Sequence, residues 1–239
     1  MGSVLNLLID RVPHRVPLGG TRAGEARAPV RWLGLSAQPW LLRRDRAGGA
    51  RLPVRWLWVE VTTAALFTAL AVRFWSSTLI PMLVLGACLV TVSVIDLQLQ
   101  RIPDRITFPT LAIALPSIVV VSLHQDHPEA IKAAVIGSVA YFALLFVTHF
   151  IYPAGMGFGD VKLALVMGLY LGWIGWTPVY PVLGPIRLVV YALMIGCVIG
   201  VVFGLTIQLI TKRRGAFAFG PALAAGCLVA IFLADQLRA

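Results

Sequence analysis

Seven apolar stretches, each close to the length of a membrane-spanning helix, dominate the sequence after residue 55. A helix needs roughly 20 residues to cross the hydrocarbon core of a bilayer. We therefore expect an all-α, polytopic membrane protein with about seven transmembrane helices. The expected spans cover residues 56–75, 78–95, 106–123, 131–151, 161–176, 188–210 and 217–234.

The first 55 residues have a different character. Residues 2–9 are apolar but too short to span a bilayer, and the chain from about 10 to 55 is rich in arginine, proline and glycine. We divide the protein into a basic cytosolic or interfacial segment, residues 1–55, and a transmembrane domain, residues 56–239.

Composition supports a lipid environment and suggests an orientation. Of the 239 residues 59% are apolar and 13% are charged, whereas a soluble domain has roughly 25% charged residues. The net charge of +10 could indicate nucleic-acid binding, but the positive-inside rule is the commoner reason in a membrane protein, and we expect no nucleic-acid partner. With the amino-terminal segment inside, sixteen of the 20 Lys and Arg residues fall in inner segments.

Two aspartates stand at the ends of expected spans. Asp96 closes the second span, and Asp160 opens the fifth after the glycine-rich turn that contains Gly157 and Gly159. Because two spans separate them, both carboxylates should lie at one membrane face, which the charge distribution makes cytoplasmic. Neighbouring carboxylates can share a proton. Such a pair suits aspartyl proteolysis, in which one acid activates water and the other protonates the scissile carbonyl.

Helix termini suggest a division of labour between the two acids. Asp160 lies at a helix N-terminus, where the macrodipole favours an anion, and Lys162 is near; Asp96 lies at a helix C-terminus. We predict that Asp160 is the ionised base and Asp96 the protonated acid. Asp104, just before the third span, is interpreted as a helix cap.

These segments resemble the type IV prepilin peptidases, membrane aspartyl proteases of the GxGD kind. The similar segments are Gly157–Leu163, Ile95–Asp96 with Ile102–Asp104, the amino-terminal Gly2–Pro13, Arg55–Glu60 and Phe219–Pro221. The resemblance implies the GxGD protease fold in a bacterial plasma membrane and cleavage of prepilin or pseudopilin leaders at the cytoplasmic face. It implies catalytic roles for Asp96 and Asp160, and a supporting active-site loop of Gly157, Gly159, Lys162 and Asp104.

Two features depart from the family pattern. Members usually have a membrane helix before the amino-terminal signature, so we expect a misassigned start codon or a lost helix. Many members also carry two Cys-x-x-Cys pairs in the cytosolic region, associated with zinc and with N-methylation, whereas the first cysteine here is Cys88. We therefore expect no metal site, neither zinc nor S-adenosylmethionine, and no N-methyltransferase activity; proteolysis by two aspartates needs no cofactor.

Other functions stay open. A proton-coupled transporter would also use paired intramembrane acids, but it predicts acids near the bilayer midplane and an inverted repeat, and the sequence shows neither. A catalytically inactive remnant would keep the fold for pilus assembly. Another GxGD protease, presenilin-like or a preflagellin peptidase, would share the acid pair, although the amino-terminal signature argues against it. The oligomeric state is not predicted.

Overall fold

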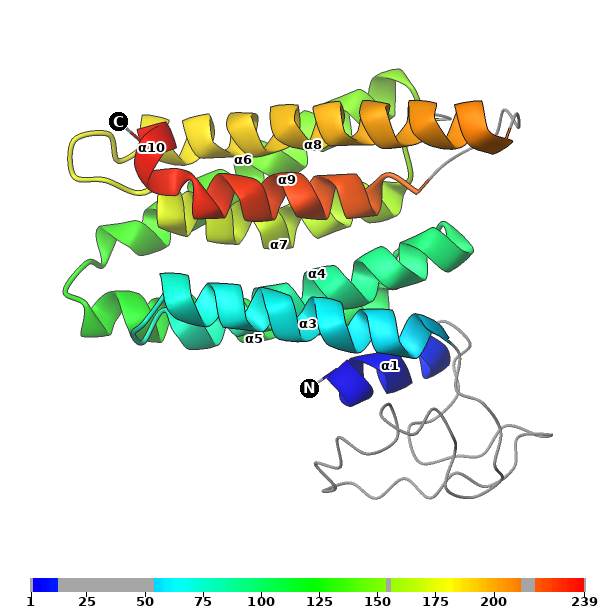
Figure 1. Ribbon diagram of the computed structural model, residues 1–239. Helices are drawn as coiled ribbons and strands as arrows, with labels where there is room; N and C mark the ends of the chain where they lie inside the picture. The colour runs from blue at the N-terminus through cyan, green and yellow to red at the C-terminus, as the bar shows by residue number, and fades with distance from the viewer. Residues whose placement is uncertain (1, 13–53, 154–155, 212–217, 239) are drawn as a thin grey trace.

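The computed structural model describes residues 2–12, 54–153, 156–211 and 218–238, and these are helical with no strand among them. The prediction of an all-α chain is confirmed for these residues. Most of the basic segment, residues 13–53, lies outside the described part. The helices are α1 (Gly2–Arg11), α3 (Val54–Arg73), α4 (Leu79–Leu99), α5 (Asp104–His124), α6 (Glu129–Ile151), α7 (Phe158–Gly175), α8 (Leu183–Thr211), α9 (Gly220–Phe232) and α10 (Ala234–Arg238) (Figure 1).

Five of these helices, α4 to α8, are long and apolar enough to cross a membrane. The chain is therefore a multi-pass membrane protein. Helix α9 is apolar but only 13 residues long, and α3 is not among the five. The count of about seven spans thus stays a prediction.

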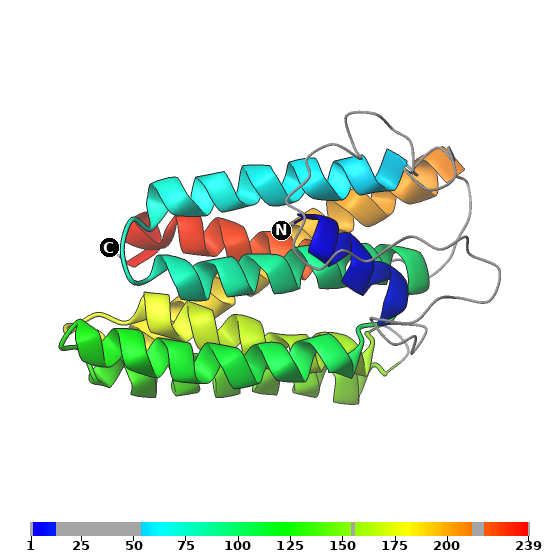
Figure 2. The ribbon, with the colours of Figure 1, turned by 90° about the horizontal axis from the view of Figure 1, so that it is seen from below.

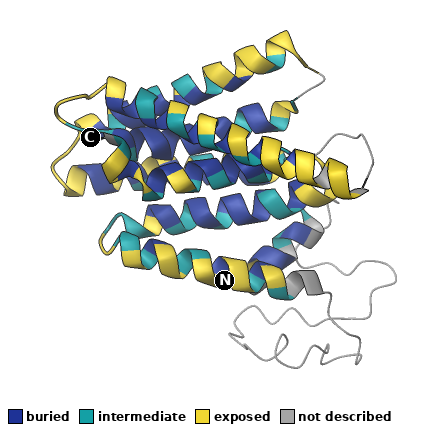
Figure 3. Ribbon diagram, turned by 45° about the horizontal axis from the view of Figure 1, so that its top comes forward, coloured by how far each residue is buried: buried dark blue, intermediate teal, exposed yellow. Residues whose placement is uncertain are grey.

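Side-chain burial divides the helices into inner and outer faces (Figure 3). Helix α7 is the most enclosed of the five, since 72% of its most apolar stretch is buried, against 33% for α8. The outer face of α8 carries exposed apolar residues such as Val198, Val201 and Val202. Exposed apolar side chains on a long helix are those expected to contact lipid, so the outer surface suits a bilayer.

Glycines bring α6 and α7 into backbone contact. A Cβ atom on Gly137 of α6 would lie 2.5 Å from the Gly168 carbonyl oxygen and 2.5 Å from the Gly172 Cα of α7. Beside this contact, the hydroxyl of the next residue, Ser138, donates a hydrogen bond of 2.9 Å to the Leu165 carbonyl. Small residues at such crossings allow helices to approach closely in membranes, and α6 and α7 therefore pack as one tight pair.

Helix α1 accounts for the short apolar stretch at the start of the chain. It packs against α3 and α4 near one end of the bundle (Figure 2). Leu5, Asn6 and Ile9 are buried. This stretch is thus a helix that packs beside the bundle, in agreement with its being too short to span a bilayer.

Polar contacts hold together the end of the bundle where α3 finishes. Arg73 of α3 forms an ion pair with Asp235 of α10. The Gln125 amide after α5 donates hydrogen bonds of 3.2 Å to the Ser77 hydroxyl and 3.1 Å to the Thr78 hydroxyl before α4. We call this the far end, because the candidate site lies at the other end of the bundle.

Candidate active site

Four helix termini meet at the end of the bundle opposite the far end: the C-terminus of α4 and the N-termini of α5, α7 and α9 (Figure 1). Asp96 lies in the last turn of α4, Asp160 is the third residue of α7, and Gly220 is the first residue of α9. Asp96 and Asp160 are 6% and 7% exposed. The structure therefore brings two buried acids, 64 positions apart in the sequence, to one place.

The chain reverses sharply after Asp96. Gln100 takes a left-handed conformation, φ 51° and ψ 40°, and its N–H donates a hydrogen bond of 2.8 Å to the Asp96 carbonyl. A left-handed residue is a common way to end a helix. Pro103 then adopts an extended conformation, and α5 starts at Asp104. This reversal keeps Asp96 at the end of α4 while the next helix turns back beside it.

The glycine-rich turn sets the position of Asp160. The Asp160 N–H donates a hydrogen bond of 3.1 Å to the Gly157 carbonyl. A Cβ atom on Gly159 would lie 2.9 Å from the Cβ of Ile102, in the α4–α5 connection, whereas one on Gly157 would make only ordinary contacts at 3.6 Å or more. Gly159 is therefore the glycine that lets the start of α7 approach the end of α4.

Gly220 lies between the two acids. Its N–H donates a hydrogen bond of 2.9 Å to Asp96 Oδ2. A Cβ atom on Gly220 would lie 2.8 Å from Asp96 Oδ2 and 3.5 Å from Asp160 Oδ1, so these two oxygens are at most 6.3 Å apart, the sum of both distances. Asp160 Oδ1 is buried and has no hydrogen-bond partner among the described residues. The arrangement leaves Asp96 Oδ2 held by a donor and Asp160 Oδ1 without one among the described residues.

The contacts of the two acids change the expected distribution of charge. A backbone N–H at a helix N-terminus stabilises a carboxylate that accepts it, and here that carboxylate is Asp96. Lys162, which the sequence placed near Asp160, instead pairs with Asp104. The Gly220 N–H thus favours a carboxylate at Asp96, and the pairing of Lys162 with Asp104 removes one reason to expect a carboxylate at Asp160. The assignment made from the macrodipoles of α4 and α7 is thereby weakened.

Asp104 is not a helix cap. The residue that precedes α5 is Pro103, and no side chain makes a capping hydrogen bond there. The Asp104 carboxylate instead accepts hydrogen bonds of 2.8 Å on both oxygens from Lys162 Nζ. The cap interpretation was wrong because sequence proximity to a helix start does not reveal a partner 58 residues away.

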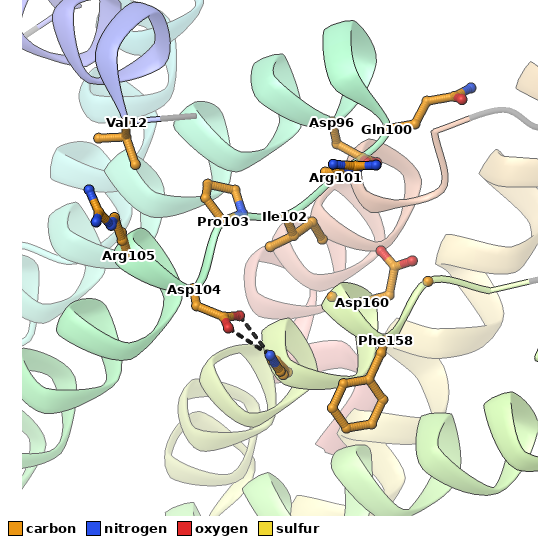
Figure 4. A pocket seen from close by; sticks show the side chains of 13 residues that line it. Val12, Asp96, Gln100, Arg101, Ile102, Pro103, Asp104, Arg105, Phe158 and Asp160 are labelled. Atoms are coloured by element: carbon orange, nitrogen blue, oxygen red, sulfur yellow. Dashed lines mark hydrogen bonds and ion pairs between the residues drawn. The ribbon is translucent and has the colours of Figure 1, made fainter. Parts of the chain in front are cut away.

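A cavity of about 520 Å³ opens over the two acids (Figure 4). Asp96, Asp160 and all four residues of the expected supporting loop line it. The other lining residues are Val12, Gln100, Arg101, Ile102, Pro103, Arg105 and Phe158. A polypeptide segment could thus reach both carboxylates from one space.

Gly220 is the site residue that sequence reasoning missed. The segment Phe219–Pro221 entered only as part of the resemblance, without a role. Its signal was the proline: Pro221 has no N–H, and the N–H groups of Ala222 and Leu223 both bond to the Phe219 carbonyl. A proline is common in the first turn of a helix, and the first N–H groups of a helix have no partner within it, so the Gly220 N–H is left to donate elsewhere.

Metal ligands are not grouped in the described part of the chain. No set of three or more His, Cys, Asp or Glu side chains there could hold a metal ion. Cys88, Cys197 and Cys227 all lie within helices of the bundle.

Residues 83–205, just over half of the chain, match the type IV leader peptidase family. This match includes both Asp96 and Asp160. The chain belongs to that family, and the resemblance seen in the sequence is confirmed.

Curated relatives agree. A prepilin leader peptidase/N-methyltransferase of Bacillus subtilis (strain 168) is 30% identical over 74% of this chain and 66% of its own length. One of Neisseria gonorrhoeae is 27% identical over 93% of this chain and 83% of its own length. A type 4 prepilin-like proteins leader peptide-processing enzyme of Escherichia coli O78:H11 is 30% identical over 73% of this chain and 60% of its own length. No solved structure matches the chain.

Proposed function

We propose that this protein is a membrane aspartic endopeptidase that removes the leader from type IV prepilin-like or pseudopilin precursors, with Asp96 and Asp160 as its catalytic pair. The observation that carries the proposal is the convergence of two buried carboxylates on Gly220, beneath a cavity open to a polypeptide. Family membership supports the reaction, and the names of the relatives support the substrate class.

The contacts suggest a division of roles between the acids. Asp96, held as a carboxylate by the Gly220 N–H, takes a proton from a water molecule between the acids. The water oxygen attacks the scissile carbonyl carbon while Asp160, protonated, donates its proton to the carbonyl oxygen. When the tetrahedral intermediate collapses, Asp96 returns its proton to the leaving amine and Asp160 recovers the hydroxyl proton. Neither a metal nor a covalent nucleophile is needed.

Charge supports a cytoplasmic active site. The site end carries Arg101, Arg105 and Lys162. The tail of basic residues from Arg11 to Arg55 leads into α3, which starts at the same end. By the positive-inside rule this end faces the cytoplasm, where the leader of a prepilin would be cut. In this proposal α3 and α9 also cross the membrane, which gives seven spans with α4 to α8. The proposal includes the GxGD protease fold.

Methyl transfer is not part of the proposal. N-methyltransferase stands in the names of several relatives, and two Cys-x-x-Cys pairs in the cytosolic region would supply four thiolates, the ligands of a structural zinc site. Residues 13–53, which lie outside the described part, contain no cysteine, so this region does not fit such a zinc site. No step is assigned to zinc or S-adenosylmethionine.

Intact-mass analysis of a prepilin-type substrate, co-expressed with the full chain, tests the function. We expect loss of the leader with the wild type and an uncut precursor with Asp96→Asn. The same spectrum reports any added methyl group. An uncut precursor with wild type, across several prepilin-type substrates, would favour the inactive remnant. Proton flux in proteoliposomes without cleavage would favour the transporter.

A further inference from the structure

We propose that Asp104 and Lys162 form a clasp that holds the α4–α5 connection against the start of α7 and so sets the spacing of Asp96 and Asp160. The inference rests on the proposed peptidase function. It concerns positioning, because Lys162 Nζ bonds to Asp104 and no contact between it and either candidate catalytic acid is found.

The contacts of Lys162 show that its side chain is held, not merely near an acid. Nζ lies 2.8 Å from both Asp104 oxygens. It also lies 5.7 Å from the ring centre of Phe108 in α5 and 5.4 Å from that of Phe158 in α7. Both distances fall in the range of cation–π contacts. One ammonium group thus joins the first turns of two helices.

A second contact joins the same two segments independently of charge. Gly159, three positions before Lys162, packs against Ile102, two positions before Asp104. The missing side chain of Gly159 permits the close approach, and the ion pair at the next turn maintains it. The clasp of Asp104 and Lys162 and the packing of Gly159 on Ile102 therefore hold the same two segments together.

Geometry connects the clasp to the acids. Asp160 directly follows Gly159, and Asp96 lies in the last turn of the helix that leads into Ile102. A shift of the α4–α5 connection relative to α7 therefore changes the separation of the carboxylates directly. Displacements of about 1 Å in a catalytic arrangement can cost about 100-fold in rate.

The clasp is partly exposed to solvent, so its effect on turnover can be distinguished from an effect on folding. The side chains of Lys162 and Asp104 are 24% and 51% exposed. Ion pairs of this kind contribute only about 0.2–1 kcal/mol to stability. A clasp variant should therefore insert and remain folded while turnover falls, and this combination is what a positioning role predicts.

The test compares Lys162→Met, Asp104→Asn and the exchanged pair Asp104→Lys/Lys162→Asp in the full chain, reconstituted in nanodiscs with a prepilin-type substrate. Each single variant should lower kcat by about 10- to 100-fold with little change in KM, in line with a loss realised in the transition state. The exchanged pair should recover most of the turnover. Lys132→Met is the matched control, since the Lys132–Glu129 pair lies at the far end, and it should cleave like wild type.

A distance measurement tests the clasp proposal independently of any cleavage activity. Spin labels at Leu99 of α4 and Ile151 of α6, both exposed, report the opening between the end of α4 and the tight α6–α7 pair. We expect a broader and longer distance distribution in Lys162→Met and a return towards wild type in the exchanged pair.

The outcomes separate the two proposals. An unchanged distribution in Lys162→Met, or single variants that turn over like an active wild type, would overturn the clasp. A wild type that cuts no prepilin-type substrate while the distance widens on loss of Lys162 would overturn the peptidase function and leave the clasp standing.

Discussion

The two ends of the helical bundle hold the same kind of side chain in opposite ways. At the far end Asp235 and Glu129 are exposed, and each is paired with a cation, Arg73 or Lys132. At the site end Asp96 and Asp160 are buried. The donor found for Asp96 is a neutral backbone N–H, and none is found for Asp160 Oδ1 within the described residues.

This contrast supports the proposal that the chemistry takes place at the site end. An exposed ion pair contributes little to stability, so its replacement changes the free energy of unfolding only slightly. A buried acid that lacks a cation costs free energy, and within a membrane protein such a group marks a functional site. The buried acids at the site end therefore lower the stability of the protein, and the ion pairs at the far end raise it slightly.

The largest expected effect is the loss of either buried acid. Asp96→Asn and Asp160→Asn should each lower cleavage by at least about 1,000-fold, because single removals from a catalytic unit cost as much as several together. Asp235→Asn, an acid at the far end, is the control and should keep activity within about 2-fold. Intact mass of the substrate measures the effect. A fully active Asp96→Asn or Asp160→Asn variant would show that the two acids are not a catalytic pair.

Gly220→Ala is expected to have the next largest effect. The added Cβ would lie 2.8 Å from Asp96 Oδ2, so the N–H donor and the carboxylate must move apart. Hydrogen bonds to charged groups contribute about 1.5–3 kcal/mol, which corresponds to a roughly 10- to 100-fold loss of kcat/KM. Thermal unfolding in detergent checks that the variant is folded. Wild-type kinetics would show that Gly220 does not position Asp96.

The two glycines of the turn before Asp160 give a finer test. Gly159→Ala places a Cβ 2.9 Å from Ile102, whereas Gly157→Ala meets only ordinary contacts. Overpacking costs about 1–3 kcal/mol, so Gly159→Ala should lower turnover by about 10-fold and Gly157→Ala by less than about 2-fold. Parallel kinetics on the two variants measure the difference. Equal effects would mean that the approach of α7 to the α4–α5 connection is unimportant.

The smallest effect belongs to the far end. Arg73→Ala removes the pair with Asp235 and should lower the free energy of unfolding by at most about 1 kcal/mol. Cleavage should not change. Reversible unfolding in mixed micelles gives the first quantity, and the substrate assay gives the second; a large loss of turnover would mean that the two ends are coupled.

Much of the fold was predictable because apolar length is a local property. The expected span 131–151 corresponds to α6, Glu129–Ile151, and the span 161–176 to α7, Phe158–Gly175. The span expected from 188 begins earlier, since α8 starts at Leu183. There Gly184 packs against the Gly175 backbone, and that contact between separate helices leaves no mark in the apolar pattern.

The site was predictable only in part, for a related reason. Counting spans was enough to place Asp96 and Asp160 at one end. It could not reveal that α9 offers Asp96 an N–H from 124 residues away, nor that Lys162 is turned towards Asp104. Both depend on which helices lie side by side, and residue type alone does not specify that.

The glycine contact between α6 and α7 has a mechanical consequence. When the backbones of two helices are in contact, the helices can slide or separate only if that contact breaks. The α6–α7 pair is therefore rigid, and Asp160 belongs to it. The separation of Asp160 from Asp96 therefore depends on how firmly the α4–α5 connection is held against α7, which is the contact that Lys162 and Asp104 make.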